Sequence, residues 1–438
     1  MEQPTLLEIL DARERRVARQ KELIVAHGCS LVSFTMNIAG PVKYSPAIDK
    51  GFSLGLARID CMLSGLPVLS RNVIREHTGC EALWAVDADP LFLKALVVHL
   101  EDRDCFGRLL DIDILDSNGR KLDRQLLGLA PRKCLLCEKE AKLCSRSRTH
   151  SVEQLQAKTA ELLDSPQETI PVSMLAVKAL LWEVFTTPKP GLVDRNNRGS
   201  HKDMDLMTFL ASTYALGPYF EEAVIIGRQT RHLPPQQTFD ALRQAGIRAE
   251  QEMLRATGGV NTHKGAIFTL GILCGALGRT NSFRPEDILS ICADMTAGIT
   301  HELDDPMLET VGARLYRKHK ITGIRGQAEK GFPAVLQVGL PRLVQGLSQG
   351  LSLNDAGCAA LLWLMTVIED TNLIARGGFE NWQTVLEDVR RILVGTPFPD
   401  ISQLSQLDKA FIQKNLSPGG SADLLALTYF LYFLQGIA

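Results

Sequence analysis

The sequence predicts a multidomain protein in which an N-terminal α+β domain is followed by an all-α helical domain. Three observations lead to this prediction. The chain has 438 residues, 45% of them hydrophobic, which is more than one ordinary core accommodates. Runs that alternate apolar and polar residues occur before residue 150, whereas three- and four-residue apolar spacing dominates after residue 172. We expect the domains to cover residues 1–165 and 172–438, with a linker at about 164–172.

Strand-like alternation is the mark of the N-terminal domain. Residues 31–38 and 109–115 alternate apolar and polar positions, as a strand with one buried face does. Residues 90–100 have the pattern of a helix between these strands, and residues 151–163 have helical spacing with a polar surface. Strands and helices mixed in one segment predict an α+β domain.

Helical periodicity dominates the rest of the chain. Strand signals are few there, so we expect only helices joined by polar loops. Gly258-Gly259 supplies a helix stop signal. The segments in which apolar residues recur at helical spacing are 172–185, 207–219, 238–256, 353–368 and 422–434.

Composition argues against several classes of partner. The net charge of -2 does not call for a polyanion such as nucleic acid. The N-terminus lacks a basic flank followed by an apolar stretch. The most apolar segments, 266–278 and 424–434, are shorter than the roughly 20 residues needed to cross a bilayer. We therefore expect a cytoplasmic protein with no nucleic-acid partner and no membrane span.

Asp111 and Asp113 form the first candidate catalytic pair. They are two residues apart in an apolar strand, so both carboxylates point to the same side. Carboxylates fixed this way can hold Mg²⁺ against a polyphosphate and support in-line attack at phosphorus, as in many nucleotidyltransferases. The alternative is an edge strand with solvated charges. The apolar neighbours, which face the core, favour the metal site; they are Leu110, Ile112 and Ile114.

A segment rich in cysteine and arginine follows this strand. Cys134-x₂-Cys137, with Cys144 and His150 further on, has the ligand types of a small zinc site. The alternative is a set of reduced cysteines packed under a basic loop. Cations that suit phosphate contacts, or that form an ordinary solvated surface, lie at Arg132, Lys133, Arg146 and Arg148.

These motifs resemble the apo-citrate lyase phosphoribosyl-dephospho-CoA transferase family over about residues 5–155. The resemblance is carried by Gly107–Leu115, Arg132, Cys134–Cys137, Cys144, Arg146 and His150, and by Arg13–Arg16, Leu31–Thr35 and Gly40–Lys43. It implies a nucleotidyltransferase-like domain. A serine hydroxyl of the citrate lyase acyl-carrier (gamma) subunit would attack the α-phosphate of 2'-(5''-triphosphoribosyl)-3'-dephospho-CoA, and diphosphate would leave. Asp111 and Asp113 would hold Mg²⁺, and the candidates for binding the triphosphate are Lys43, Arg108 and Arg132.

Polar loops at helix ends are the second candidate site. Residues 187–205 combine prolines and glycine with acids, cations and a histidine, and residues 258–265 could bind an anion at a helix start. Each loop alone could be ordinary surface, but a helical bundle can gather such ends into one polar site. In the last loop, 416–423, we expect Ser421 or Asp423 to cap the final helix. The remaining loops are 301–309, 323–328 and 369–378.

The loop sequences resemble triphosphoribosyl-dephospho-CoA synthase over about residues 172–438. The matching stretches are Thr187–Asp194, Gly259–Gly265, Gly323–Ala328 and Asp370–Gly378. The resemblance implies condensation of ATP with 3'-dephospho-CoA, with release of adenine. We expect His201 or His263 to act as acid or base. We expect Mg²⁺ at some of Asp194, Asp203, Asp205 and Asp370, and phosphate contacts from Lys189, Lys264, Arg325 and Arg376.

Two alternatives stay open at this point. One is the equivalent pair of activities for malonate decarboxylase, although the Cys-Leu-Leu-Cys segment is more similar to the citrate lyase version. The other is a zinc-stabilised binding module fused to a Mg²⁺-dependent helical phosphohydrolase or prenyl-type enzyme. In the preferred interpretation the product of the second domain is the donor for the first, so fusion raises its local concentration.

Overall fold

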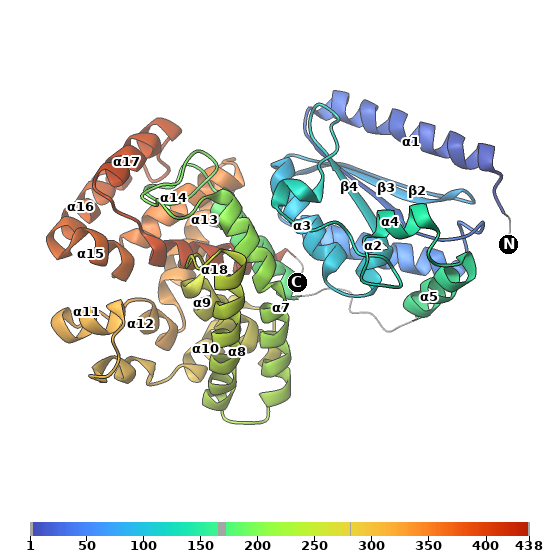
Figure 1. Ribbon diagram of the computed structural model, residues 1–438. Helices are drawn as coiled ribbons and strands as arrows, with labels where there is room; N and C mark the ends of the chain where they lie inside the picture. Colours follow the sequence, from blue (N-terminus) through green and yellow to red (C-terminus); the bar gives the residue numbers. More distant parts are fainter. Residues whose placement is uncertain (1–2, 165–171, 281, 437–438) are drawn as a thin grey trace. The chain divides into compact units, whose positions relative to one another are not determined.

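The computed structural model describes residues 3–164, 172–280 and 282–436. The chain forms two compact units, residues 1–174 and 175–438 (Figure 1). The expected linker falls largely on residues 165–171, which lie outside the described part of the chain.

The first unit is built around one four-stranded antiparallel sheet with the strand order β2-β3-β1-β4. The two predicted strands are its neighbours β1 and β4, and the hairpin β2-β3 completes the sheet on the other side of β1. The strands are β1 (Ser30–Met36), β2 (Val68–Glu76), β3 (Gly79–Val86) and β4 (Leu110–Leu115). The helices are α1 (Leu6–His27), α2 (Pro46–Leu63), α3 (Pro90–Asp102), η1 (Phe106–Leu109), η2 (Arg124–Leu127), α4 (Ala141–Ser147) and α5 (Val152–Asp164).

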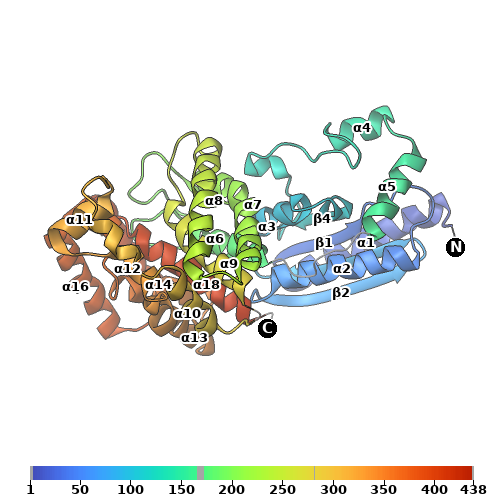
Figure 2. The same ribbon diagram turned by 90° about the horizontal axis from the view of Figure 1, so that it is seen from below.

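The two faces of this sheet have different neighbours. On one face Leu31 packs with Ile24 of α1, and Figure 1 shows α1 running along this side. On the opposite face Phe34 stacks on Phe52 of α2, with ring centroids 5.0 Å apart; Figure 2 shows α2 along that face. Side chains alternate along a strand, and β4 pairs Asp111 with Thr35. Asp111 therefore lies on the α1 face, as does Asp113.

The second unit contains helices and no strand among its described residues, which is consistent with the all-α prediction. The predicted helix 207–219 continues to Thr230 with Pro218 inside it. The helices are α6 (Val172–Phe185), α7 (Leu206–Thr230), α8 (Pro235–Ala256), α9 (Lys264–Arg279), α10 (Pro285–Met295), η3 (Ile299–Asp304), α11 (Val311–His319), α12 (Gly323–Glu329), η4 (Val335–Gly339), α13 (Leu340–Ser348), α14 (Leu353–Met365), α15 (Thr371–Gly377), α16 (Phe379–Gly395), α17 (Ile401–Gln413) and α18 (Gly419–Gln435).

Three apolar helices, α9, α14 and α18, supply much of the core of the second unit, and most of their residues are buried. Glycines bring α7 and α9 into close contact: a Cβ on Gly227 would lie 2.1 Å from the carbonyl oxygen of Gly275. Such burial leaves the helix ends as the places where polar side chains gather.

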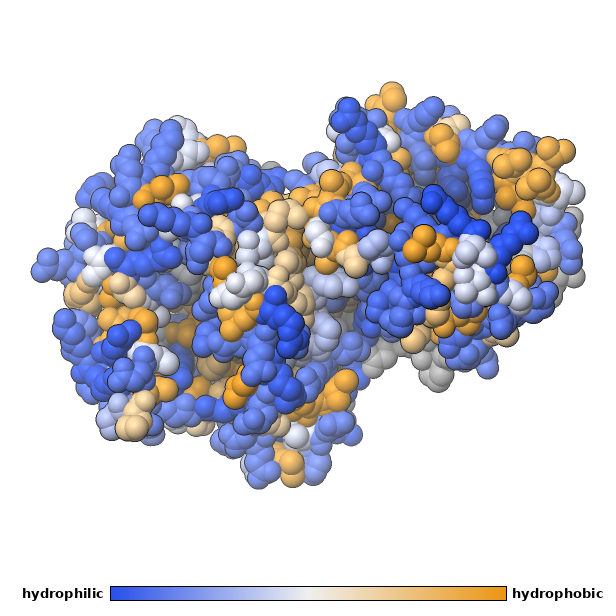
Figure 3. All heavy atoms as spheres, in the orientation of Figure 1, coloured by the Kyte–Doolittle hydropathy of each residue, from blue (hydrophilic) through white to orange (hydrophobic). Residues whose placement is uncertain are grey.

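The visible surface in Figure 3 is largely hydrophilic, with apolar residues in scattered patches. Among the described residues, none of the helices is both long and apolar enough to traverse a bilayer.

Two candidate catalytic cavities

The first unit has a cavity of about 390 Å³ between α1 and the strands β1, β2 and β3. Two of the predicted site residues, Lys43 and Asp111, line it. The other charged residues of its wall are Arg13, Arg16, Arg19, Glu76 and Glu81. The cavity thus sets a row of cations opposite a carboxylate of the predicted catalytic pair.

The cations of α1 are spaced three residues apart, which places them on one side of the helix. Arg16 lies 3.7 Å from Glu81, and Arg19 pairs with the same carboxylate. Burial lowers the pKa of Arg16, an effect opposed by the nearby charges of Asp111 and Asp113. Burial and the charge of Arg13 lower the pKa of Lys43. These partly buried cations are fixed in place and offer a suitable surface for a polyanion.

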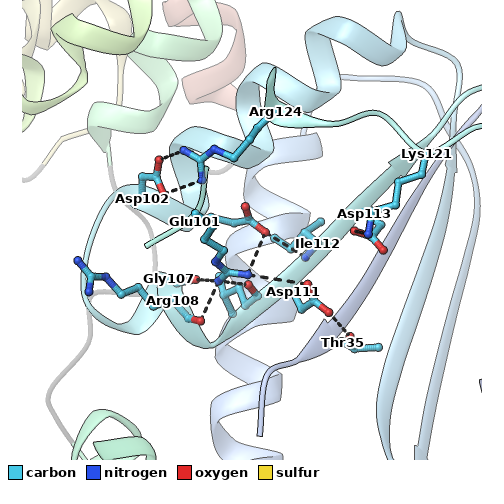
Figure 4. Close-up of polar contacts among 12 residues, drawn as sticks. Thr35, Glu101, Asp102, Gly107, Arg108, Asp111, Ile112, Asp113, Lys121 and Arg124 are labelled. Atoms are coloured by element: carbon cyan, nitrogen blue, oxygen red, sulfur yellow. Dashed lines mark hydrogen bonds and ion pairs between the residues drawn. The ribbon is translucent and has the colours of Figure 1, made fainter. Parts of the chain in front are cut away.

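Asp111 and Asp113 lie on the same side of β4, as their spacing predicts (Figure 4). Asp111 accepts a hydrogen bond from the Thr35 hydroxyl over 3.4 Å, and its side chain is 54% exposed. Asp113 forms an ion pair of 2.6 Å with Lys121. Asp111 lines the cavity, whereas Asp113 is not part of its wall.

The other two predicted phosphate contacts, Arg132 and Arg108, do not line the cavity. Both donate hydrogen bonds to backbone carbonyl oxygens. Arg132 donates to the carbonyl oxygens of Arg108 and Leu110 over 2.8 and 2.6 Å. It also lies 3.8 Å from Asp111 and 3.7 Å from the buried Glu101, whose pKa is raised by burial. Arg108 in turn donates to the carbonyl oxygen of Cys134 over 3.0 Å.

The second unit has a cavity of about 490 Å³ at which the polar helix ends meet. Residues distant in sequence, from the 187–205 loop to the start of α18, share this wall. The predicted site residues that the structure brings together here are Lys189, His201, Asp203, His263, Lys264, Asp370 and Arg376.

Three predicted residues of this domain do not line the cavity. Asp194 accepts hydrogen bonds from the backbone N–H groups of Lys189, Asn196 and Asn197, so it organises its own loop. Asp205 caps α7 by accepting from the N–H of Thr208 over 3.0 Å. Arg325 lies 3.2 Å from Glu302 and lines a separate, largely apolar cavity of about 450 Å³.

Buried acids form one part of the wall. Glu183 of α6 makes a buried ion pair with Lys189. Burial raises the pKa of Glu183 and of Asp370. Burial also raises the pKa of Asp423 well above its usual range, and the charges of Glu183 and Asp370 act in the same direction. Burial therefore makes it harder for Asp423 to lose its proton, which suits a group that donates a proton during a reaction.

The two histidines of the wall are both held neutral. Burial and the charge of Arg376 lower the pKa of His201 to about 4, and its ring nitrogens contact Ser417 and Arg376 over 2.9 and 3.2 Å. Burial lowers the pKa of His263 to about 3. Nδ1 of His263 lies 2.7 Å from the Ser212 hydroxyl, while its buried Nε2 has no hydrogen-bond partner within the described residues.

Sequence patterns missed Glu183 and misplaced Asp423. Glu183 sits inside an apolar helix and belongs to no motif, so nothing but its burial distinguishes it. The expectation that Ser421 or Asp423 caps the last helix is wrong, because α18 begins at Gly419 with no side-chain cap. Ser421 instead donates to Asp370. Asp423 packs against Gly265, where an added Cβ would lie 1.8 Å from its oxygen.

The predicted zinc ligands are also brought together, and none of them lines either cavity. The ligand atoms of Cys134, Cys137, Cys144 and His150 all lie within 4.8 Å of one another.

Family comparisons match both parts of the chain. Residues 4–165 match the family described as apo-citrate lyase phosphoribosyl-dephospho-CoA transferase, and residues 171–438 match that described as ATP:dephospho-CoA triphosphoribosyl transferase. Protein CitXG of Haemophilus influenzae is 36% identical, covering 98% of this chain and 96% of its own length. Protein CitXG of Leuconostoc mesenteroides subsp. cremoris is also 36% identical, covering 99% and 98%. The 2-(5''-triphosphoribosyl)-3'-dephosphocoenzyme-A synthase of Pectobacterium atrosepticum is 45% identical over 58% of this chain and 86% of its own.

Two units with separate charged cavities, matched by two transferase families, define a bifunctional transferase. The chain belongs to the family of fused CitXG proteins, which joins the apo-citrate lyase phosphoribosyl-dephospho-CoA transferase and ATP:dephospho-CoA triphosphoribosyl transferase families. It acts in the biosynthesis of the citrate lyase prosthetic group. The matches do not favour a malonate decarboxylase pair or a binding module fused to a phosphohydrolase or prenyl-type enzyme.

Proposed function

We propose that residues 172–438 condense ATP with 3'-dephospho-CoA, and that residues 1–165 transfer the product to the acyl-carrier subunit of citrate lyase. The observation that carries the proposal is the cavity of the second unit, whose wall combines two histidines of lowered pKa, a buried carboxyl group of raised pKa and cations. The condensation needs a base for a hydroxyl, an acid for the departing adenine and cations for an uncleaved triphosphate.

The condensation exchanges one bond at the anomeric carbon of ATP for another. The 2'-hydroxyl oxygen of dephospho-CoA bonds to that carbon, and the bond to N9 of adenine breaks. In our proposal the free Nε2 of His263 accepts the hydroxyl proton, and Asp423 donates a proton to adenine. The ring of His263 is fixed by its contacts with Ser212 and Phe209, so the accepting nitrogen is held in place. In this step one bond forms as one breaks, each proton has an assigned acceptor or donor, and the triphosphate stays intact.

Cations on the cavity wall would bind the triphosphate. Lys264 starts α9 and its side chain is 58% exposed, so it can leave its ion pair with Glu250 to meet a phosphate. Arg376 donates to the Ser200 carbonyl over 2.8 Å and contacts His201, which fixes its position. We favour these two residues as the phosphate contacts, because Lys189 already forms a buried ion pair with Glu183.

Mg²⁺ would neutralise the polyphosphates at both sites. In the second cavity we assign it to Asp203, whose side chain is exposed on the wall. Asp370 has oxygens that already accept hydrogen bonds, so in our proposal it organises the loop ends. In the first unit the exposed Asp111, with Asp113 beside it on β4, offers the oxygen ligands that this ion prefers.

In the first unit the proposed step is attack of a carrier serine hydroxyl on the α-phosphate of the donor, with diphosphate leaving. The Arg13, Arg16 and Lys43 side chains would hold the triphosphate in the cavity. Charge that develops on the leaving diphosphate would thus meet fixed cations, which is how most phosphoryl-transfer sites work. The open Asp111 side of the cavity would admit the serine.

The test is a reconstitution with the full chain, ATP, 3'-dephospho-CoA, Mg²⁺ and the apo acyl-carrier subunit. Chromatography follows adenine, and mass spectrometry follows the mass of the carrier. We expect His263→Gln to lose adenine release but to modify the carrier when given purified donor. We expect Asp111→Asn to release adenine normally but to leave the carrier unmodified. Phosphate release without adenine, or loss of both activities in both variants, would refute this assignment.

A further inference from the structure

The segment 131–150 has almost no hydrophobic core of its own. All of its residues are described, and the only buried ones are Cys134 and Cys144, each about 5% exposed. Leu143, the largest apolar side chain of α4, is 56% exposed. A 20-residue segment that buries so little apolar area needs another source of order, and a bound metal is a common one in small folds.

Two of the distances among the four ligand atoms approach the edges of a metal tetrahedron, and all four atoms lie within 4.8 Å of one another. Sγ of Cys137 lies 3.5 Å from Sγ of Cys144 and 3.3 Å from Nε2 of His150. Zn–S bonds of about 2.3 Å and Zn–N bonds of about 2.0–2.1 Å give tetrahedral edges of roughly 3.8 Å between sulfurs and 3.6 Å between sulfur and nitrogen. These two distances come within a few tenths of an ångström of the ideal values.

The local backbone presents each ligand from a defined position. Cys134 and Cys137 lie in a tight hairpin, in which the Cys134 N–H donates to the Lys139 carbonyl over 2.8 Å and residues 133 and 140 form a bridge. Cys144 lies on the short helix α4, and Arg148 ends this helix in the left-handed region with φ 48°. The chain then turns back, because the Thr149 N–H donates to the Cys144 carbonyl over 3.1 Å, and His150 follows.

We propose that Cys134, Cys137, Cys144 and His150 bind one structural Zn²⁺ that fixes the position of Arg132 beside Asp111. The set is closed, with three thiolates and one imidazole, and so leaves no open position for catalysis. Arg132 precedes Cys134 by two residues, and the Cys134 carbonyl accepts from Arg108. Arg132 then donates to three carbonyls, those of Gly107 and Arg108 in η1 and of Leu110 at the start of β4. It lies 3.8 Å from Asp111.

The alternative for the same atoms is a cluster of reduced thiols, or a disulfide between Cys137 and Cys144. Neither explains why a histidine nitrogen joins the cluster within hydrogen-bond distance of a thiol sulfur. A disulfide would also tie α4 to the hairpin, but it would leave Cys134 and His150 without a shared role. The zinc site differs from both alternatives in a measurable quantity, the metal content of the protein.

The experiment measures zinc in the full-length protein by inductively coupled plasma mass spectrometry after dialysis against a weak chelator. We expect one zinc per chain, and the Co²⁺-substituted protein should show thiolate-to-metal charge transfer and the intense visible bands of a tetrahedral site. A protein that carries no zinc, fails to take up Co²⁺ with these spectra, or contains a Cys137–Cys144 disulfide in intact-mass analysis would overturn the proposal.

Variants separate a metal ligand from an ordinary buried cysteine. Cys137→Ser should lose most of the zinc, whereas Cys105→Ser, at an exposed cysteine outside the cluster, should keep it. His150→Cys should retain zinc and shift the Co²⁺ bands, because it preserves a four-ligand set, whereas His150→Ala should lose the metal. Zinc retained in both Cys137→Ser and His150→Ala would contradict the assignment.

The positioning role has its own readout. Adenine release belongs to the other unit and should stay within about twofold of wild type in His150→Ala, which reports that the second unit has folded. Carrier modification should fall about 10- to 100-fold, the usual cost of disturbing supporting residues around a site. His150→Cys should restore it. Unchanged carrier modification in the zinc-free variant would refute the link to Arg132 and Asp111.

Discussion

Ser421 donates both its backbone N–H and its hydroxyl to Oδ2 of Asp370, over 2.8 and 2.9 Å. Oδ1 of the same carboxylate accepts from the N–H groups of Asn372 and Leu373 at the start of α15. One buried carboxylate therefore joins the N-terminal ends of α15 and α18. Burial raises the pKa of Asp370, and the hydrogen bonds and partial positive charge of the two helix ends oppose that effect.

Asp370→Asn should destabilise the second unit and abolish adenine release. An amide cannot accept on both sides, so at least one buried donor would be left without a partner, at a cost of about 1–3 kcal/mol. Ser421→Ala keeps the backbone donor and should cost about 1 kcal/mol with most of the activity retained. Chemical denaturation and adenine release measure both effects. Equal losses in the two variants would show that the hydroxyl, not the carboxylate, is the critical group.

Asp423→Asn should stabilise the protein at neutral pH while abolishing adenine release. Burial and the nearby acids raise the pKa of Asp423 in the folded state, so that state binds more protons than the unfolded chain above the unfolded pKa. Stability is therefore lost as pH rises from the unfolded pKa, about 3.9, towards the folded one. The variant removes this loss, so its Tm gain should be present at pH 7 and vanish near pH 3.

The control for this pH dependence is Asp388→Asn, the same substitution on α16 at a side chain that is 39% exposed. It should change Tm little at either pH and leave adenine release intact. A Tm gain for Asp423→Asn that is the same at both pH values would rule out a raised pKa as its cause.

Local patterns were enough to predict the elements that carry the sites. Alternation along 109–115 placed Asp111 and Asp113 on one face, since period-two burial is a property of a strand alone. Helical spacing likewise located α6, α8 and α14. These inferences needed no information about which elements are neighbours in space.

Long-range geometry decided the rest. Asp194 and Asp203 belong to one loop and are equally polar in sequence, yet backbone amides surround Asp194 and only Asp203 lines the cavity. Glu183 becomes part of the wall because the loop after α6 turns back and brings Lys189 to it. Arg132 carries the charge expected of a phosphate ligand, but the fold directs it to carbonyl oxygens. Such outcomes depend on packing partners that sequence spacing does not encode.

The buried pair Glu183 and Lys189 should couple strongly in a double-mutant cycle. Removing one partner leaves a buried charge uncompensated, which costs about 3–5 kcal/mol. Lys189→Met and Glu183→Gln should each lower the free energy of unfolding by about that amount, whereas the double variant should recover a large part of it. Urea denaturation followed by circular dichroism measures all four proteins. Additive losses would show that the two side chains do not interact.

Arg16→Gln should weaken carrier modification without changing adenine release. Arg16 lines the first cavity and interacts electrostatically with both Asp111 and Asp113. Its replacement therefore removes a fixed cation from the proposed triphosphate site. We expect a 10- to 100-fold loss of kcat/KM for the donor, which corresponds to about 1.4–2.7 kcal/mol, and a weaker dependence of KM on salt. Lys21→Gln removes an equal charge from the exposed side of the same helix and should leave both quantities near wild type. If the two variants behave alike, the cation row of α1 acts only through net charge and does not bind the donor directly.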